Sequence, residues 1–193
     1  MNTMFETLLQ LPLFQGMCHE DFTIILDKAK FHFAKHKAGK CIVNAGDPCD
    51  RLCFLLNGEL NMTTCSDGGI LSVVERISGP YVAEPHSLFG MEPSFAASYS
   101  AYTEANTVAV DKASITTLLF YYEVFRFNYI NMIVNRTQHL YTRLWEKPVG
   151  EIRKKIARFF LMHCEKSAGE KIFKIKMNDL ALYLDTTRLN TSR

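Results

Sequence analysis

One uninterrupted helical stretch, residues 121–147, constrains the fold of this chain more than any other part of the sequence. It contains no Pro and no Gly, and its apolar or neutral residues recur at intervals of three and four. That spacing is the a and d pattern of a coiled coil, and Tyr141 widens the stripe on the same face. An ordinary core helix is the alternative. We predict a dimerisation helix whose interface consists of Ile130, Ile133, Val134, Thr137, Leu140 and Leu144.

The charge of the chain is placed unevenly. At 193 residues it is long enough for one large or two small domains, and its net charge is only +2. Residues 1–145 hold 11 Lys and Arg against 14 Asp and Glu, whereas residues 146–193 hold 11 against 6. A basic C-terminal segment on a faintly acidic body predicts a nucleic-acid partner, with a solvated helix surface as the alternative.

The cysteines and the apolar runs indicate the compartment. The six cysteines form no CxxC pair, and neither a secretory signal nor an apolar run of about 18 residues is visible. We therefore expect a cytoplasmic protein with reduced thiols and no membrane contact. Cys49 and Cys53 are four positions apart on or near a strand, so they face the same side. They form either a redox pair or two buried, unreactive thiols.

The hydrophobic period of the N-terminal part changes near Ala29. Residues 3–28 predict two short helices separated at Pro12, and short apolar or alternating runs bounded by turn residues follow. The dipeptide Asn57-Gly58 is typical of a β-hairpin. Short strands spaced by about ten residues indicate a β-sandwich or jelly roll. The expected strands are 31–33, 42–43, 52–56, 60–64, 70–77, 99–103, 107–111 and, near the C-terminus, 172–175.

The run KAGKCIVNAGDPCDRLCFLLNGEL, residues 37–60, places Gly39, Gly46 and Gly58 between apolar strands. It resembles the cyclic-nucleotide-binding jelly roll of the Crp/Fnr transcription regulators. The order of barrel, long helix and basic helices extends this resemblance over nearly the whole chain. The resemblance implies an α+β fold with three parts. They are a jelly-roll sensor domain at 1–120, a dimerisation helix at 121–147 and an incomplete, helical winged-helix-type DNA-binding domain at 148–193.

The same resemblance implies a ligand site between two strands of the barrel. Glu84 falls where the family binds the ribose, whereas Phe95 falls where an Arg pairs with the phosphate; Ala83 replaces a Gly. No Lys or Arg lies between positions 76 and 112. The residues predicted to line the site are Ala83, Glu84, Phe95, Ala96, Leu140 and Tyr141.

A cyclic phosphate that leaves water needs a cation, and the cassette from Tyr81 to Ala101 supplies none. We therefore predict that neither cyclic AMP nor cyclic GMP is the effector and that the pocket takes an apolar or uncharged ligand, or is filled. The alternative is that Arg136 or Arg143 reaches into the pocket and replaces the missing Arg.

Other cofactors and enzymatic activities find little support in the residues. An iron–sulphur cluster needs several cysteines near the N-terminus, where only Cys18 occurs, so we do not expect one. Haem ligation by His32, His36 or His86 stays open. A cupin-like metalloenzyme requires a His-x-His pair, and the spacing of His32 and His36 does not fit. No P-loop, GxGxxG or nucleophile–base pattern is present, so we expect no enzyme.

The C-terminal run MNDLALYLDTTRLNTSR predicts two helices separated by a turn at Asp185, with Thr186 or Thr187 as the cap of the second helix. It resembles the helix-turn-helix of the Crp/Fnr family, whose second helix enters the major groove. A plain helical hairpin is the alternative. Arg188 matches a guanine-reading Arg, while Leu189 replaces a cytosine-reading Glu. The resemblance implies DNA contacts by Thr187, Arg188, Asn190, Thr191 and Arg193.

These observations predict an effector-sensing, homodimeric, bacterial-type transcription regulator. Its partners would be duplex DNA, a second copy of the chain, RNA polymerase and a small molecule of unknown identity. The second hypothesis is a regulatory module that binds a small molecule or a protein partner and does not read DNA.

Overall fold

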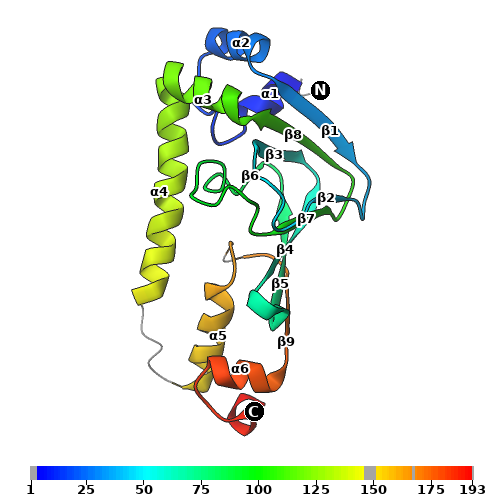
Figure 1. The fold of residues 1–193 in the computed structure, drawn as a ribbon, viewed down its shortest axis with the longest axis vertical. Helices are drawn as coiled ribbons and strands as arrows, with labels where there is room; N and C mark the ends of the chain where they lie inside the picture. The colour runs from blue at the N-terminus through cyan, green and yellow to red at the C-terminus, as the bar shows by residue number, and fades with distance from the viewer. Residues whose placement is uncertain (1–3, 146–150, 167, 193) are drawn as a thin grey trace.

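The computed structural model describes residues 4–145, 151–166 and 168–192 (Figure 1). Two short helices precede a β-sandwich, and two consecutive helices lead from it to a C-terminal segment, which we define as residues 151–192. The helices are α1 (Met4–Leu9), α2 (His19–Lys28), α3 (Lys112–Tyr121), α4 (Glu123–Trp145), α5 (Ile152–Met162), α6 (Met177–Tyr183) and α7 (Arg188–Thr191). The strands are β1 (Phe31–His36), β2 (Cys41–Val43), β3 (Arg51–Asn57), β4 (Glu59–Cys65), β5 (Leu71–Ser78), β6 (Tyr81–Ala83), β7 (Ser98–Ala101), β8 (Ala105–Asp111) and β9 (Lys171–Ile175).

The sandwich consists of two antiparallel sheets. One sheet has the order β1-β8-β3-β6 and the other the order β2-β7-β4-β5-β9. Burial alternates along the longer strands, as in β5, where every second residue from Leu71 to Ile77 is buried. The predicted α+β fold with an antiparallel sandwich is confirmed. Each expected strand is present, while β6 and the helix α3 were not predicted.

A cluster of aromatic rings joins the N-terminal helices, the sandwich and α4. The ring of Phe14 is fully buried, with its centroid 5.1 Å from Phe22, 6.0 Å from Phe54 and 5.2 Å from Phe125. The side-chain amide of Asn128 donates hydrogen bonds to the backbone oxygens of Leu13 and Gln15. Because aromatic side chains dominate the energetics of a core, these contacts fix the first turns of α4 on the sandwich.

The prediction of a hairpin at Asn57-Gly58 is wrong. β3 pairs with β6 and β8, whereas β4 pairs with β5 and β7, so the chain crosses from one sheet to the other at this point. Gly58 has φ +86°, and a Cβ at this position would lie 2.4 Å from the backbone oxygen of Glu104. The glycine is required because another backbone approaches the corner closely, and the dipeptide alone does not specify which strands pair.

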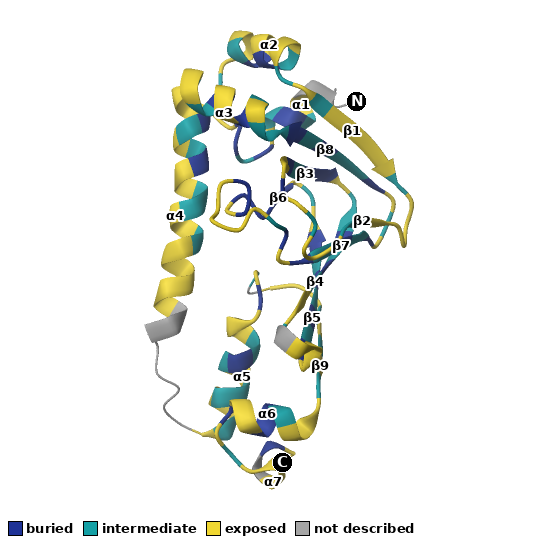
Figure 2. Ribbon diagram, viewed as in Figure 1, coloured by how far each residue is buried: buried dark blue, intermediate teal, exposed yellow. Residues whose placement is uncertain are grey.

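Helix α4 runs along one side of the molecule from the top of the sandwich towards α5 (Figure 1). α3 and α4 are separated at Tyr122, which has extended backbone angles. The inner face of α4 packs on the sandwich through Phe125, Tyr129, Met132 and Ile133. The far half of the helix is exposed over most of its surface (Figure 2). Apolar side chains remain exposed along it at Phe127, Ile130, Val134, Leu140 and Tyr141.

The C-terminal segment packs against the hairpin formed by β4 and β5. Its strand β9 adds to the outer edge of β5 in antiparallel register, and α5 and α6 lie beside these strands (Figure 1). A second, smaller core forms where the elements meet. It consists of the buried residues Leu71, Val73, Phe159, Cys164, Leu180 and Leu184. The sequence predicted β9 as a strand, but the pairing with the sandwich was not anticipated.

None of the helices in the described part of the chain is both long and apolar enough to cross a bilayer.

Candidate functional site

A cavity of about 540 Å³ lies where the sandwich, α4 and the C-terminal segment meet. The sandwich supplies mostly apolar and aromatic side chains, with Met62, Tyr81 and Ala97 among them. α4 supplies Ile133, Arg136, Thr137 and Leu140. The end of α5 and the residues after it supply Met162, His163, Cys164 and Glu165. Pockets of this size and apolar character are suited to one small molecule.

Glu84 is the most extensively hydrogen-bonded side chain of this cavity. Its carboxylate accepts hydrogen bonds from the backbone N–H groups of Ala96 and Ala97 at 2.7 and 2.8 Å. The hydroxyls of Ser87 and Tyr99 donate to the same carboxylate at 3.1 and 3.3 Å. Glu84 is 5% exposed and has φ +35°, a left-handed conformation that non-glycine residues rarely adopt. The neighbouring backbone therefore holds this residue in place as an internal anion.

Phe95, in contrast, belongs to the core and not to the cavity wall. It is buried, and its ring centroid lies 6.4 Å from that of Tyr99. Its backbone pairs with the turn at Gly46 and Asp47. The Phe95 ring thus packs in the core, next to the two backbone amides that donate hydrogen bonds to Glu84.

The six predicted ligand residues separate into two groups. Glu84, Ala96 and Leu140 line the cavity. Ala83 is buried at the end of β6, Phe95 lies in the core and Tyr141 is 63% exposed; none of these three is among the lining residues. Ala83 and Phe95 belong instead to the hydrophobic core of the sandwich.

Arg136 is the only Lys or Arg among the described residues that line the cavity. Its guanidinium lies 2.9 Å from the carboxylate of Glu165, and it donates to the backbone oxygen of Val82 at 3.4 Å. It also lies 5.8 Å from the ring centroid of Tyr81. The sequence indicated this Arg only as an alternative, through its place on α4. Its charge is already compensated by the C-terminal segment.

Burial keeps the phenols and thiols of this region protonated. It raises the pKa of Tyr81 to about 12, with a further contribution from the Glu165 carboxylate, and it raises the pKa of Tyr99. The pKa values of Cys49 and Cys53 are both raised to about 11, mainly by burial. Thiols with such pKa values are poor nucleophiles at neutral pH, which favours the interpretation that these two are unreactive. No group of three potential metal ligands occurs in the part of the chain that the structure describes.

The loop that follows β6 packs against α4 and also contributes to the cavity wall. The hydroxyl of Tyr129 donates to the backbone oxygen of Pro85, and the ring of Phe89 lies 6.0 Å from the ring of Tyr129. His86, from the same loop, lines the cavity together with His139 and His163. These histidines were not assigned to a common site from sequence, because their proximity arises only from the packing of α4 and α5.

The predicted DNA-reading residues lie at the far end of the C-terminal segment. Arg188 is exposed at the first position of α7, next to Thr187, which is also exposed. Thr191 is 8% exposed, and its hydroxyl donates to the backbone oxygen of Thr187 at 3.1 Å. The side chain of Asn190, Arg193 and the side chain of Leu144 on α4 lie outside the described part of the structure.

Comparison with protein-family models and with curated proteins gives no match. Among solved structures, the catabolite activator protein of Thermus thermophilus has a TM-score of 0.61 at 21% identity, covering 94% of this chain and 84% of that chain. The sensor domain of the transcriptional regulator DNR from Pseudomonas aeruginosa has a TM-score of 0.59 at 13% identity, covering 76% and 95%. A transcriptional regulator from Thermotoga maritima has a TM-score of 0.56 at 17% identity, covering 65% and 95%.

These likenesses show the fold. The sandwich followed by a long helix is the architecture of the sensor domains in Crp/Fnr-type regulators, as the glycines of residues 37–60 indicated. Two of the proteins named above are described as transcriptional regulators and the third as a catabolite activator protein. What this chain itself binds is decided by its own residues, because fold does not imply function.

Proposed function

We propose that the protein is an effector-sensing regulator of transcription that binds duplex DNA as a homodimer. The observation that carries this proposal is the composition of the cavity wall. The sandwich, α4 and the C-terminal segment all contribute to it. A molecule in the cavity therefore contacts both the sensing part and the segment to which we assign DNA binding. A ligand can shift an equilibrium between two conformations only through such differential contacts.

The DNA-binding surface is α7 with the basic side chains of α5. Arg188 is exposed at the start of α7, where a recognition helix presents its N-terminal residues to base edges. A guanidinium can contact the O6 and N7 atoms of guanine simultaneously. Thr187 and the exposed Arg153 and Lys154 are suited to contacts with phosphates.

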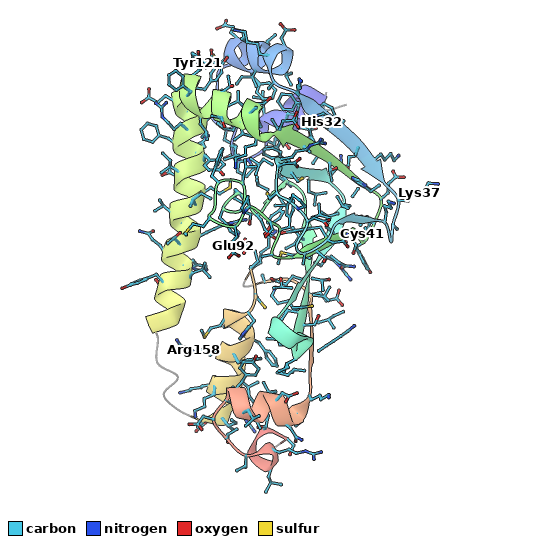
Figure 3. All side chains as sticks on the ribbon, in the orientation of Figure 1. His32, Lys37, Cys41, Glu92, Tyr121 and Arg158 are labelled. Carbon is cyan, nitrogen blue, oxygen red and sulfur yellow. The ribbon has the colours of Figure 1, made fainter. Side chains whose placement is uncertain are left out.

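Selection of duplexes from a random pool tests this assignment. We expect enrichment of an inverted repeat whose half-sites are about one helical turn apart. Arg188→Ala should relax selection at one base pair per half-site and weaken specific binding by about 1–3 kcal/mol. Lys37→Ala is the matched control, because Lys37 extends from the edge of the sandwich, away from α7 (Figure 3). Equal losses on selected and random duplexes would contradict the role of Arg188 as a base reader.

The second copy binds along α4. Phe127, Ile130, Val134 and Tyr141 form an exposed apolar stripe with the spacing of a coiled-coil seam. Ile133 contributes only in part to this interface, since it packs against the core of its own sandwich. Thr137 and Leu140 lie between the stripe and the cavity, so a ligand and a second chain would contact neighbouring turns of one helix.

The effector is an uncharged or apolar molecule and is neither cyclic AMP nor cyclic GMP. The amides of Ala96 and Ala97 already bind the carboxylate of Glu84, so they are not free to bind a phosphate. The one Arg in the described wall is paired with Glu165. Burial of a phosphate without a cation and without free N–H groups costs several kcal/mol, by the general cost of desolvating a charge.

One observation favours the second function, a regulatory module that does not read DNA. Leu189 occupies an exposed position of α7 where a polar side chain would be suited to base contacts, and it is 63% exposed. An apolar side chain at this position can donate no hydrogen bond to a base edge. The selection experiment separates the two functions, because a module of this kind enriches no sequence.

A further inference from the structure

Glu75 is buried at the point where the C-terminal segment meets the sandwich. It lies on β5 and is only 1% exposed. The backbone N–H groups of Glu165 and Lys166 donate hydrogen bonds to its carboxylate. The Nζ atom of Lys171 lies 3.1 Å from the same carboxylate. All these partners belong to the C-terminal segment, so the negative charge of Glu75 is compensated by them only while that segment is in place.

Two further ion pairs join the C-terminal segment to the rest of the molecule, one to β5 and one to α4. Arg76 lies 2.6 Å from the carboxylate of Glu170, and Arg136 lies 2.9 Å from that of Glu165. After these pairs in the sequence, β9 runs along β5 in continuous register from residue 171 to residue 175. The contact thus consists of one added strand, three ion pairs and the small apolar core around Phe159.

A contact of this composition is suited to being made and released. Buried ion pairs add little net stability, because desolvation offsets most of the attraction, but they do specify one arrangement. β9 is an edge strand with Ile172 and Lys174 exposed on its outer side. Elements with few buried apolar contacts open locally at a lower free energy than the core of a domain.

The ion pairs also form part of the cavity wall. Glu75, Arg136 and Glu165 all line the cavity described above. A ligand therefore contacts both the sandwich and residues 162–165 only while β9 is paired with β5. Because a ligand stabilises the conformation to which it binds more tightly, an occupied cavity must favour the paired state.

We propose that β9 is a releasable latch, and that occupancy of the cavity controls it. In the closed state β9 is the fifth strand of the sheet and Glu75 is covered. In the open state Glu165, Lys166 and β9 leave the sandwich, and α6 and α7 are free to reorient. The ligand closes the latch. This inference rests on the proposed ligand-sensing role of the cavity and adds the way in which the C-terminal segment responds to it.

Amide hydrogen exchange in the full chain tests the latch. We expect protection at residues 165–175 in the parent protein. Glu75→Gln should accelerate exchange there at least tenfold and leave the core strands β3 and β8 unchanged. Lys174→Met and Lys176→Met are the controls, because both residues are exposed on or next to β9 and neither belongs to the three ion pairs, and they should change exchange less than threefold. Equal exchange in Glu75→Gln and the controls would overturn the proposal.

A disulfide between β5 and β9 shows whether faster exchange in Glu75→Gln comes from release of β9 or from general instability of the variant. Val74 and Ile172 are directly paired across β5 and β9, so cysteines at these positions can form a disulfide. Adding Val74→Cys and Ile172→Cys to Glu75→Gln should restore protection under oxidising conditions and lose it on reduction. Failure of the oxidised lock to restore protection would mean that Glu75 supports the whole fold and not a latch.

The ligand arm uses N-phenyl-1-naphthylamine, a neutral apolar fluorophore, as the probe. At ten times its dissociation constant the probe should slow exchange at residues 165–175 by about tenfold, if it binds the closed state alone. Unchanged or faster exchange would overturn the coupling. No DNA is involved, so a failed duplex selection leaves this result standing, and a failed exchange experiment leaves the DNA-binding proposal standing.

Discussion

The carboxylate of Glu84 accepts a hydrogen bond from the backbone N–H of Ala97, 13 residues further along the chain, at 2.8 Å. This hydrogen bond joins the two ends of the loop between β6 and β7. Its acceptor is a carboxylate of the protein itself and not of a ligand. Two consequences can be measured, one for stability and one for the ligands that the site accepts.

Removing the Glu84 side chain should destabilise the fold. Glu84→Ala leaves the N–H groups of Ala96 and Ala97 without their acceptor, and an unsatisfied buried group costs roughly 1–3 kcal/mol. Urea unfolding should show a loss in this range. Glu92→Ala is the control, because Glu92 is an exposed residue of the same loop (Figure 3). If the two variants unfold alike, Glu84 has no such role. Sulphate should also stabilise Glu84→Ala selectively, since the amides are then free to bind an anion.

The cavity should discriminate between ligands by charge. N-phenyl-1-naphthylamine should bind at least tenfold more tightly than 8-anilino-1-naphthalenesulfonate, which has the same aromatic rings and adds a sulfonate. Leu140→Trp should weaken the neutral probe, because the larger side chain enters the cavity from an exposed position. Met91→Trp is the control at an exposed position that is not among the lining residues. Fluorescence titration measures all four affinities.

Cyclic nucleotides should not bind tightly to the cavity. We expect no dissociation constant below about 10 µM, a binding free energy of about −7 kcal/mol, for cyclic AMP or cyclic GMP by calorimetry. Tighter binding would show that Arg136 leaves Glu165 to pair with the phosphate. In that case Arg136→Met should abolish the binding, which would show that Arg136 binds the phosphate.

Charges on the outer face of α4 should produce monomers. Ile130→Asp combined with Val134→Asp places two carboxylates in the apolar stripe, and burying them unpaired costs several kcal/mol. Asn135→Asp adds one charge on a different side of the helix and should leave the association unchanged. Sedimentation at micromolar concentration gives the mass of each species. A monomeric parent protein would contradict the proposed interface.

The thiols of Cys49 and Cys53 should react slowly with iodoacetamide at neutral pH. Their pKa values of about 11 leave on the order of one thiolate in ten thousand at pH 7. Because only the thiolate reacts, and its fraction grows tenfold per pH unit below the pKa, alkylation should accelerate about tenfold per pH unit up to pH 11. Cys18, Cys41 and Cys65 are exposed and serve as internal references. Rapid modification of Cys53 at pH 7 would instead favour the hypothesis that Cys49 and Cys53 form a redox pair. Mass spectrometry of peptides separates the sites.

Local patterns predicted much of this fold. The alternation from residue 31 onwards and the apolar runs that follow gave the strands, because burial on one face of a strand repeats every second residue. The uninterrupted residues 121–147 predicted one helix, which the structure contains as α4, beginning at Glu123. Arg188 was placed correctly at the start of a helix, since a Thr before it is a suitable cap.

Long-range pairing was not predictable in the same way. Asn57-Gly58 indicated a turn, but the identity of the paired strands depends on residues such as Glu104 that are distant in the sequence. The pairing of β9 with β5 depends on the Glu75 contacts, which join residues 90 or more positions apart. Glu84 was predicted as a ligand residue, yet its partners are amides of its own loop, and backbone N–H groups leave no signal in a sequence.

The attachment of α4 to the sandwich at one end has a mechanical consequence. Phe125 and Asn128 fix the first turns on the sandwich, and the hydroxyl of Tyr129 donates a hydrogen bond to the backbone oxygen of Pro85. Met132 and Ile133 also pack on the sandwich, so the helix can tilt only about a point near Ile133. At 1.5 Å per residue, Trp145 lies about 18 Å along the axis from Ile133. A tilt of about 15° at that point moves Trp145 by about 5 Å, which is close to one helical turn.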